Sequence, residues 1–141
     1  MTKKQLSLSS LLMAQKKFEQ FRQCLGNEQL KTGAIKSFEY CFELSWTTLK
    51  KYLELYEAIE DLRGSRDTIR AAARLGILKN PEAWFDFIES RNLSSHVYEE
   101  DTADEIIEML PLFSDELGHL INEINNRLRK TDDDKNGSKA L

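Results

Sequence analysis

The feature that most constrains the fold is a long run in which one face of a helix would be apolar. Its stripe consists of Ile35, Phe38, Phe42, Ser45, Leu49, Tyr52 and Tyr56, and each follows the previous one by three or four positions. This spacing predicts a single helix of about 30 residues, far longer than the mean helix of a globular domain. Such a helix needs packing partners along its whole length.

Apolar periodicity predicts a further helix on each side of this long one. The first covers residues 8–25 and stops at Gly26. The other is short, begins with Ser65 as its cap and stops at Gly76. A serine side chain accepts hydrogen bonds from the free amides of a first turn, and glycine suits the left-handed residue that often ends a helix.

Two more helices are predicted towards the C-terminus. One begins with Asn80 as its cap, followed by Pro81, a residue suited to the first helical position. The last opens with the capping box Thr102-x-x-Glu105 and carries an apolar stripe over several turns. Pro111 lies within this stripe and predicts a kink.

Together these elements predict an all-α protein, an up-and-down antiparallel bundle of four to five helices without a convincing strand. We assign residues 1–130 to a single domain. We expect residues 131–141, TDDDKNGSKAL, to form a disordered polar tail. Tyr40, Phe87 and Leu112 lie off the main stripes, so a self-complementary surface and a homodimer are expected.

The net charge of −4 limits the possible functions. The surface as a whole does not attract polyanions, so nucleic-acid binding requires a local basic patch. No run approaches the roughly 18 apolar residues of a membrane span, and polar residues interrupt the N-terminal stretch too early for a signal peptide. We expect a soluble, cytoplasmic protein that does not contact membranes. Cys24 and Cys41 are isolated and are expected to be reduced thiols.

The segment RNLSSHVY, residues 91–98, holds an arginine, a histidine and a tyrosine close together. On an uninterrupted helix, Arg91 and His96 would point roughly 140° apart. Ser94-Ser95 is weak helix material. If the chain leaves helical geometry there, His96 and Tyr98 become i and i+2 of an extended segment and project the same way. Arg91 in the last helical turn could then converge on both.

This combination suits attack on an RNA phosphodiester. Histidine takes and gives protons near neutrality, and the arginine fork matches a phosphate and stabilises charge that grows on it. The 2′-hydroxyl of RNA is an internal nucleophile, so we expect no metal and no other cofactor. One histidine does not readily serve as both the general acid and the general base, and a two-fold dimer would supply a second histidine.

The residues alone also allow a simpler interpretation of this segment. Arg91 could be an ordinary surface arginine, and His96 could satisfy the end of a helix. Tyr98 could pack its ring and point its hydroxyl to water.

A second candidate site is a row of arginines stepping by three, four and four: Arg63, Arg66, Arg70 and Arg74. Such a row could hold an RNA backbone or the acidic face of a partner. Acidic residues nearby, Glu60, Asp61 and Asp67, leave open that it is a solvated face.

The pair Glu116-x-x-His119 has the spacing found in di-iron bundles, which require two such elements. The chain has one, so no metal site is expected. There is also no Gly-rich phosphate loop and no Gly-Ser with spaced aspartates, so the chain itself is not expected to transfer nucleotides.

The segment RNLSSHVY resembles the Arg-x4-His-x-Tyr motif of the HEPN superfamily, with Asn92 included in the match. Residues 37–54, SFEYCFELSWTTLKKYLE, are similar to the long second helix of its branch of nucleotidyltransferase substrate-binding proteins. TADEIIEMLPLF resembles the last helix of that branch. The similarity spans nearly the whole chain except the tail.

The resemblance implies a helical-bundle dimer that acts as a toxin, with a minimal nucleotidyltransferase as its antitoxin. It implies a metal-independent ribonuclease in which Arg91 and His96 are catalytic and Asn92 supports them. It further implies that the partner neutralises the toxin by transferring AMP from ATP to Tyr98. Other members of the branch are described only as subunits that hold a nucleotidyltransferase's substrate. That role stays open here, as does a plain helical scaffold.

Overall fold

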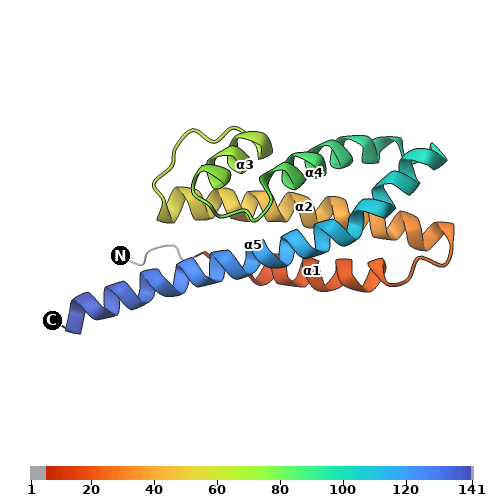
Figure 1. Cartoon of the computed structure of the whole chain (residues 1–141). Helices are drawn as coiled ribbons and strands as arrows, with labels where there is room; N and C mark the ends of the chain where they lie inside the picture. The colour runs from red at the N-terminus through yellow and green to blue at the C-terminus, as the bar shows by residue number, and fades with distance from the viewer. Residues whose placement is uncertain (1–5, 141) are drawn as a thin grey trace.

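A computed structural model describes the backbone of residues 6–140 and the side chains of residues 6–99 and 101–132. Its helices, in chain order, are α1 (Ser9–Arg22), α2 (Glu28–Tyr56), α3 (Ser65–Arg74), α4 (Pro81–Leu93), the 3-10 turn η1 (Ser94–His96) and α5 (Glu100–Ala140). Successive long helices reverse direction, and α3 lies at one end of the bundle (Figure 1). No strand occurs within residues 6–140, and the predicted all-α bundle is confirmed.

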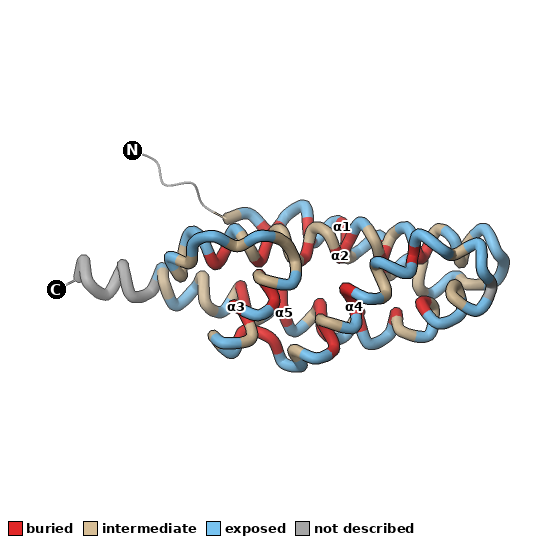
Figure 2. The backbone as a smooth tube through the Cα atoms, turned by 90° about the horizontal axis from the view of Figure 1, so that it is seen from above, coloured by how far each residue is buried: buried red, intermediate tan, exposed pale blue. Residues whose placement is uncertain are grey.

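Helix α2 is the long central helix that the apolar stripe predicts. It has 29 residues, and the side chain of Asn27 caps it by accepting a hydrogen bond from the Leu30 amide at 2.8 Å. Every position of the predicted stripe except Tyr56 is buried. Buried residues recur at intervals along each of the helices that pack with it (Figure 2). The stripe therefore does contact partners along most of its length.

An aromatic cluster around Phe113 joins four helices. The Phe113 ring on α5 is fully buried and lies edge-on to Phe18 of α1, Phe38 of α2 and Phe87 of α4, at centroid distances of 5.2, 5.0 and 5.2 Å. Trp84 packs against the same ring at 6.0 Å. Edge-to-face pairs stabilise a core beyond the area that they bury. The expectation that Phe87 lies on a dimer surface is wrong, because its ring is part of this core.

The predicted N-terminal signals of two helices need correction. The cap of α3 is Gly64, with φ of 117°, a conformation that favours glycine, and Ser65 is the first helical residue. Helix α5 begins at Glu100, so the predicted capping residue Thr102 lies inside its first turn. The reason is the turn that precedes it, in which the Ala103 amide already donates to the Glu99 carbonyl at 3.2 Å.

The cap of α4 is as predicted. The Asn80 side chain accepts a hydrogen bond from the Ala83 amide at 3.3 Å, and Pro81 occupies the first turn. Helices α1 and α2 also approach closely, because a Cβ added to Gly33 would lie 2.6 Å from the ring of Phe21.

The course of α5 bears on two further predictions. Pro111 lies inside the helix, and the first turns of α5 are inclined to its longer remainder (Figure 1). The helical backbone continues to Ala140, beyond the predicted boundary at residue 130. The side chains of residues 133–141 lie outside the described part, so the disordered tail over 131–141 stays a prediction. Within the described residues, none of the helices combines the length and the apolar character required to cross a membrane.

Replacing Phe113 with alanine tests the importance of the aromatic cluster. The variant should lose about 3–5 kcal/mol of unfolding free energy, because it leaves a cavity where four helices meet. Urea unfolding followed by circular dichroism measures the loss. The neighbouring Leu112 is 42% exposed, and Leu112→Ala should cost about 1 kcal/mol or less. Equal losses in the two variants would contradict this role for the Phe113 ring.

Candidate active site

The RNLSSHVY segment lies where α4 ends and passes through η1 towards α5. The buried Ser94 lies at the C-terminal end of α4, where its amide donates to the carbonyls of Arg91 and Ser90 and its hydroxyl donates to the Arg91 carbonyl at 2.6 Å. The chain then forms one 3-10 turn over Ser94–His96. It does leave α-helical geometry at the two serines, but the extended segment expected there is wrong. Serine competes for backbone partners by local hydrogen bonds, which favours a turn at this point.

The side chains of His96 and Tyr98 meet on this turn. His96 Nδ1 lies 3.2 Å from the Tyr98 hydroxyl, and the two ring centroids are 5.9 Å apart at an angle of 67°. Both side chains are exposed, Tyr98 to 78%. Val97 between them has φ of −70° and ψ of −8°, so a tight turn brings the rings together. The pair is therefore open to solvent and to a second macromolecule.

Arg91 lies in the last turn of α4 and faces α2. Its Nη1 lies 3.2 Å from Glu39 Oε2 and donates to Ser94 Oγ at 3.2 Å. Its Nε lies 3.4 Å from Glu43 Oε1, without hydrogen-bond geometry. Among the described side chains, no hydrogen bond joins Arg91 to His96 or Tyr98. One chain therefore places the arginine and the histidine in one segment without bringing them into direct contact.

Two residues of this site were not predicted from the sequence, namely Glu39 and Glu43. They lie four positions apart on α2 and pair with the Arg91 side chain, which is 33% exposed. Their spacing was the available signal, since it places both carboxylates on one face of the helix. The predicted supporting residue, Asn92, is exposed, and its carbonyl accepts a hydrogen bond from Ser95 Oγ at 3.0 Å.

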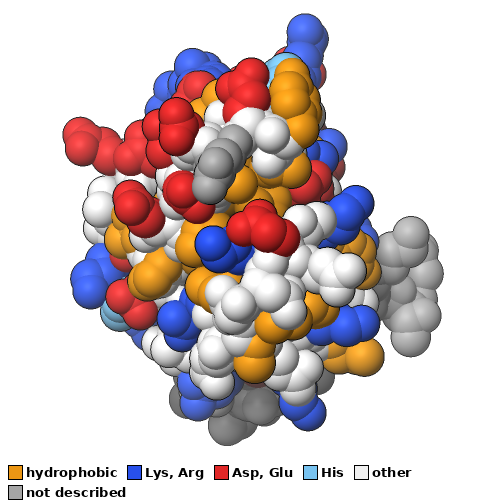
Figure 3. All heavy atoms as spheres, turned by 90° about the vertical axis from the view of Figure 1, so that its right-hand side faces the viewer, with side chains coloured by type: hydrophobic (Ala, Val, Ile, Leu, Met, Phe, Trp, Pro, Cys, Tyr) orange, Lys and Arg blue, Asp and Glu red, His pale blue; other side chains and the backbone are white. Residues whose placement is uncertain are grey.

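A shallow groove of about 380 Å³ runs beside this arginine. It is lined by Lys36, Glu39, Tyr40, Glu43 and Arg91. Tyr40 is 63% exposed there. At the end of the bundle where α4 leads towards α5, acidic and basic side chains alternate with apolar patches (Figure 3). This face offers local contacts of both signs and no single positive field.

The predicted arginine row is exposed on and beside α3, but most of its members are already paired. Arg63 lies 3.2 Å from Asp61, Arg66 lies 3.3 Å from Glu89, and Arg70 lies 3.8 Å from Asp67. Arg74 has no ion pair with any of the described side chains. Exposed pairs such as these are weak and exchange with other anions, so the row keeps part of its capacity for phosphate.

Glu116 and His119 are used by the fold. The buried Glu116 accepts a hydrogen bond from the Asn80 amide at 3.0 Å, and His119 Nε2 lies 3.1 Å from Lys79 Nζ. Within the described parts of the chain, no three His, Cys, Asp or Glu side chains are placed to hold a metal ion.

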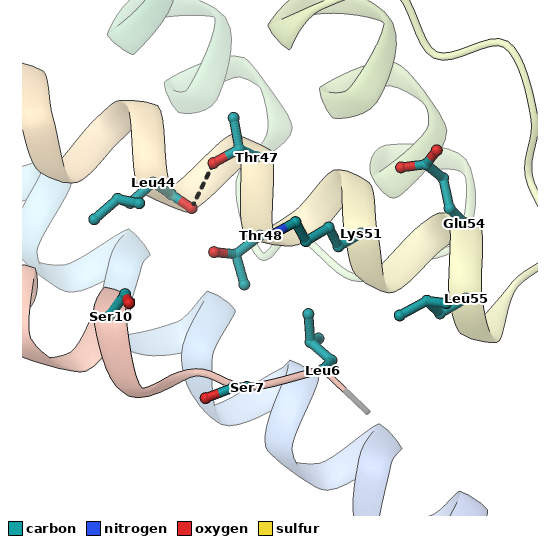
Figure 4. A pocket seen from close by; sticks show the side chains of 9 residues that line it. All are labelled: Leu6, Ser7, Ser10, Leu44, Thr47, Thr48, Lys51, Glu54 and Leu55. Atoms are coloured by element: carbon teal, nitrogen blue, oxygen red, sulfur yellow. Dashed lines mark hydrogen bonds between the residues drawn. The ribbon is translucent and has the colours of Figure 1, made fainter. Parts of the chain in front are cut away.

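A second groove, of about 630 Å³, lies between the segment before α1 and the C-terminal half of α2 (Figure 4). Its apolar side chains are Leu6, Leu44 and Leu55, and Lys51 and Glu54 also line it. None of the residues predicted to be functional lines it. Its shape therefore does not bear on the candidate site.

Comparison with known proteins agrees with the fold. The family described as nucleotidyltransferase substrate binding protein like matches residues 4–126, which is most of the chain. The chain belongs to this family, and the expected place in the corresponding branch of the HEPN superfamily is confirmed.

A relative from Haemophilus influenzae, named probable ribonuclease HepT, is 30% identical over 104 residues, which cover 71% of this chain and 70% of the relative.

Two solved structures share the fold. A protein from Thermus thermophilus superposes with a TM-score of 0.76 at 24% identity, covering 81% of this chain and 98% of the other. A Haemophilus influenzae protein superposes with a TM-score of 0.75 at 24% identity, covering 84% and 99%. Its structure is described as revealing the fold of a substrate binding domain of a nucleotidyltransferase.

Proposed function

We propose that this chain is a metal-independent ribonuclease toxin of the cytoplasm, and that its cognate antitoxin is a minimal nucleotidyltransferase that transfers AMP to Tyr98. The observation that carries the proposal is the exposed His96 on a turn directly after the helix that holds Arg91. The relative named probable ribonuclease HepT supports the same reaction class.

In the proposed reaction His96 takes the proton of the RNA 2′-hydroxyl. The 2′-oxygen attacks the adjacent phosphorus, the bond to the 5′-oxygen breaks, and a 2′,3′-cyclic phosphate remains. Arg91 binds the phosphate and stabilises the charge that develops on it. To do so it exchanges Glu39 and Glu43 for phosphate. The exchange is feasible because the Arg91 side chain is partly exposed and its Nε lies 3.4 Å from Glu43 without hydrogen-bond geometry. Asn92, exposed beside Arg91, is proposed to support the phosphate contact.

The proposed cleft is shared by two chains. The 5′-oxygen needs a proton donor while the 2′-hydroxyl needs an acceptor, and one imidazole does not serve both at once. A two-fold dimer that pairs the α4–η1 segments brings a second Arg91 and a second His96 to the same cleft. The arginine row of α3, including Arg74, is proposed to hold more distant RNA phosphates or the acidic face of the partner enzyme.

The proposed AMP transfer to Tyr98 explains how the antitoxin would neutralise the toxin. An AMP ester on this exposed hydroxyl places a negative charge and a nucleoside beside His96, where they repel RNA phosphate and fill the cleft.

A second function is favoured by the family description and by the groove at Arg91. In that case the chain is a non-catalytic subunit that presents a substrate to the nucleotidyltransferase. Absence of RNA cleavage and of growth inhibition by the wild-type protein would favour this role over the ribonuclease.

Variants of Arg91 and His96 test the catalytic proposal. His96→Ala should lower the rate of RNA cleavage by about 10²–10⁴-fold, as expected for loss of a general acid or base. Arg91→Ala should also abolish cleavage and relieve growth inhibition, while the far-UV circular dichroism stays unchanged. Cleavage is followed by gel analysis of labelled RNA with EDTA present, and mass spectrometry identifies the cyclic phosphate.

The chain offers a matched control for each of these variants. His119 is the other histidine and is exposed, and Arg127 is a half-buried arginine that pairs with Glu123 at 2.9 Å. His119→Ala and Arg127→Ala should keep the cleavage activity. If they lose it to the same extent as the site variants, the losses reflect general damage to the fold.

The shared cleft predicts a stable dimer. Sedimentation equilibrium at micromolar concentration should give a mass of two chains. A cysteine introduced beside His96 should be joined to the same cysteine of the second chain by a thiol-reactive cross-linker, because the two α4–η1 segments face each other. A monomer under these conditions would remove the two-chain mechanism.

Replacing Tyr98 with phenylalanine tests the proposed regulation. The variant keeps the ring but loses the acceptor oxygen, so it should stay toxic when the nucleotidyltransferase is co-expressed. Wild type and the control Tyr56→Phe, at a half-buried tyrosine away from the site, should both be neutralised and should gain AMP, seen by intact mass and peptide mapping. Neutralisation of Tyr98→Phe to the wild-type extent would show that the partner acts by occlusion of the cleft.

A further inference from the structure

We propose that His96 also takes part in the modification of Tyr98, by accepting the phenolic proton while the Tyr98 oxygen attacks ATP. This inference rests on the proposed AMP transfer and adds a residue role to it. The imidazole that serves RNA cleavage would then also serve its own inactivation.

The contact between the two side chains carries the inference. His96 Nδ1 and the Tyr98 hydroxyl are 3.2 Å apart, within the distance for direct proton transfer between a hydroxyl and a base. The nearest acidic neighbour along the chain, Glu99, has its Oε2 3.5 Å from Thr102 Oγ1 instead. Among the described side chains, the imidazole is therefore the base that stands beside this hydroxyl.

The turn keeps the two groups together and accessible. Ser94 is buried and bonded to the Arg91 carbonyl, and the Glu99 amide donates to the His96 carbonyl at 3.1 Å, which closes the loop around Val97. Tyr98 nevertheless remains largely exposed. A partner enzyme with bound ATP can therefore approach the hydroxyl without displacing the histidine.

The transfer exchanges one bond at the α-phosphorus of ATP for another. The Tyr98 oxygen forms a bond to this phosphorus, and the bond from the phosphorus to the bridging oxygen of the β-phosphate breaks. Pyrophosphate leaves with the bonding electrons, and the phenolic proton passes to His96 Nδ1. ATP and its magnesium are brought by the nucleotidyltransferase. The protonated imidazole then returns the proton to water.

The two nitrogens of the His96 imidazole allow it to act as a base in AMP transfer and as a base in RNA cleavage. When Nε2 carries the proton, Nδ1 is free to accept from the Tyr98 hydroxyl, as modification requires. When Nδ1 carries it and donates to the Tyr98 oxygen, Nε2 is the free base that RNA cleavage requires. Once AMP is attached, the tyrosine oxygen has no proton to give, and the nucleotide occupies the space beside the ring.

An asparagine in place of His96 separates proton transfer from simple positioning. Its side-chain oxygen lies near the position of Nδ1 and still accepts a hydrogen bond, but it does not take up a proton at neutral pH. His96→Asn and His96→Ala should each acquire AMP about a hundredfold more slowly than wild type. The rate is measured by intact mass with purified nucleotidyltransferase, ATP and magnesium. Added imidazole should restore part of the rate to His96→Ala.

His119→Asn serves as the matched control and should be modified at the wild-type rate, and circular dichroism should show that all variants are folded. If His96→Asn is modified as fast as wild type, the histidine only orients the hydroxyl or plays no part, and the inference is overturned. If wild-type Tyr98 gains no AMP, the proposed regulation itself fails. RNA cleavage by wild type, measured separately, then still decides the ribonuclease proposal.

Discussion

The packing of the Phe113 ring against α1, α2 and α4 is the interaction on which the rest of the structure depends. It fixes α5 to the bundle at the depth of the central helix, and it holds the aromatic face of α4 against α2. The C-terminal end of α4 is therefore set beside α2, where Arg91 reaches Glu39 and Glu43. The position of the candidate site follows from a fully apolar contact elsewhere in the core.

Much of this architecture could be predicted because its signals are local. A stripe with steps of three and four determines a helix and the face that it buries, and the Asn80-Pro81 pair determines where α4 begins. The caps and first residues of α3 and α5 could not be predicted in the same way. Each depends on the conformation of the loop before it, and a serine or threonine nearby gives a competing signal of equal strength.

The candidate site was predicted in part for the same reason. The weakness of Ser94-Ser95 as helix material is local, and the chain does turn there so that His96 meets Tyr98. The direction of Arg91 is not local. It is set by carboxylates about 50 positions earlier in the chain, on another helix. The spacing of Glu39 and Glu43 places them on one face of α2, but it does not indicate which residue they pair with. Phe87 differs from its prediction for a similar reason, since its burial depends on the ring of Phe113.

The 3-10 turn explains why the distance of two positions between His96 and Tyr98 matters. In an α-helix, residues two apart are turned by about 200°, so their side chains point roughly 160° apart, on opposite faces. Had α4 continued through Ser94, the imidazole and the phenol would be separated by the helix itself. Because α4 ends at Leu93 and a 3-10 turn follows, the two rings meet instead. The place where α4 ends thus determines whether the imidazole and the phenol of this segment lie side by side.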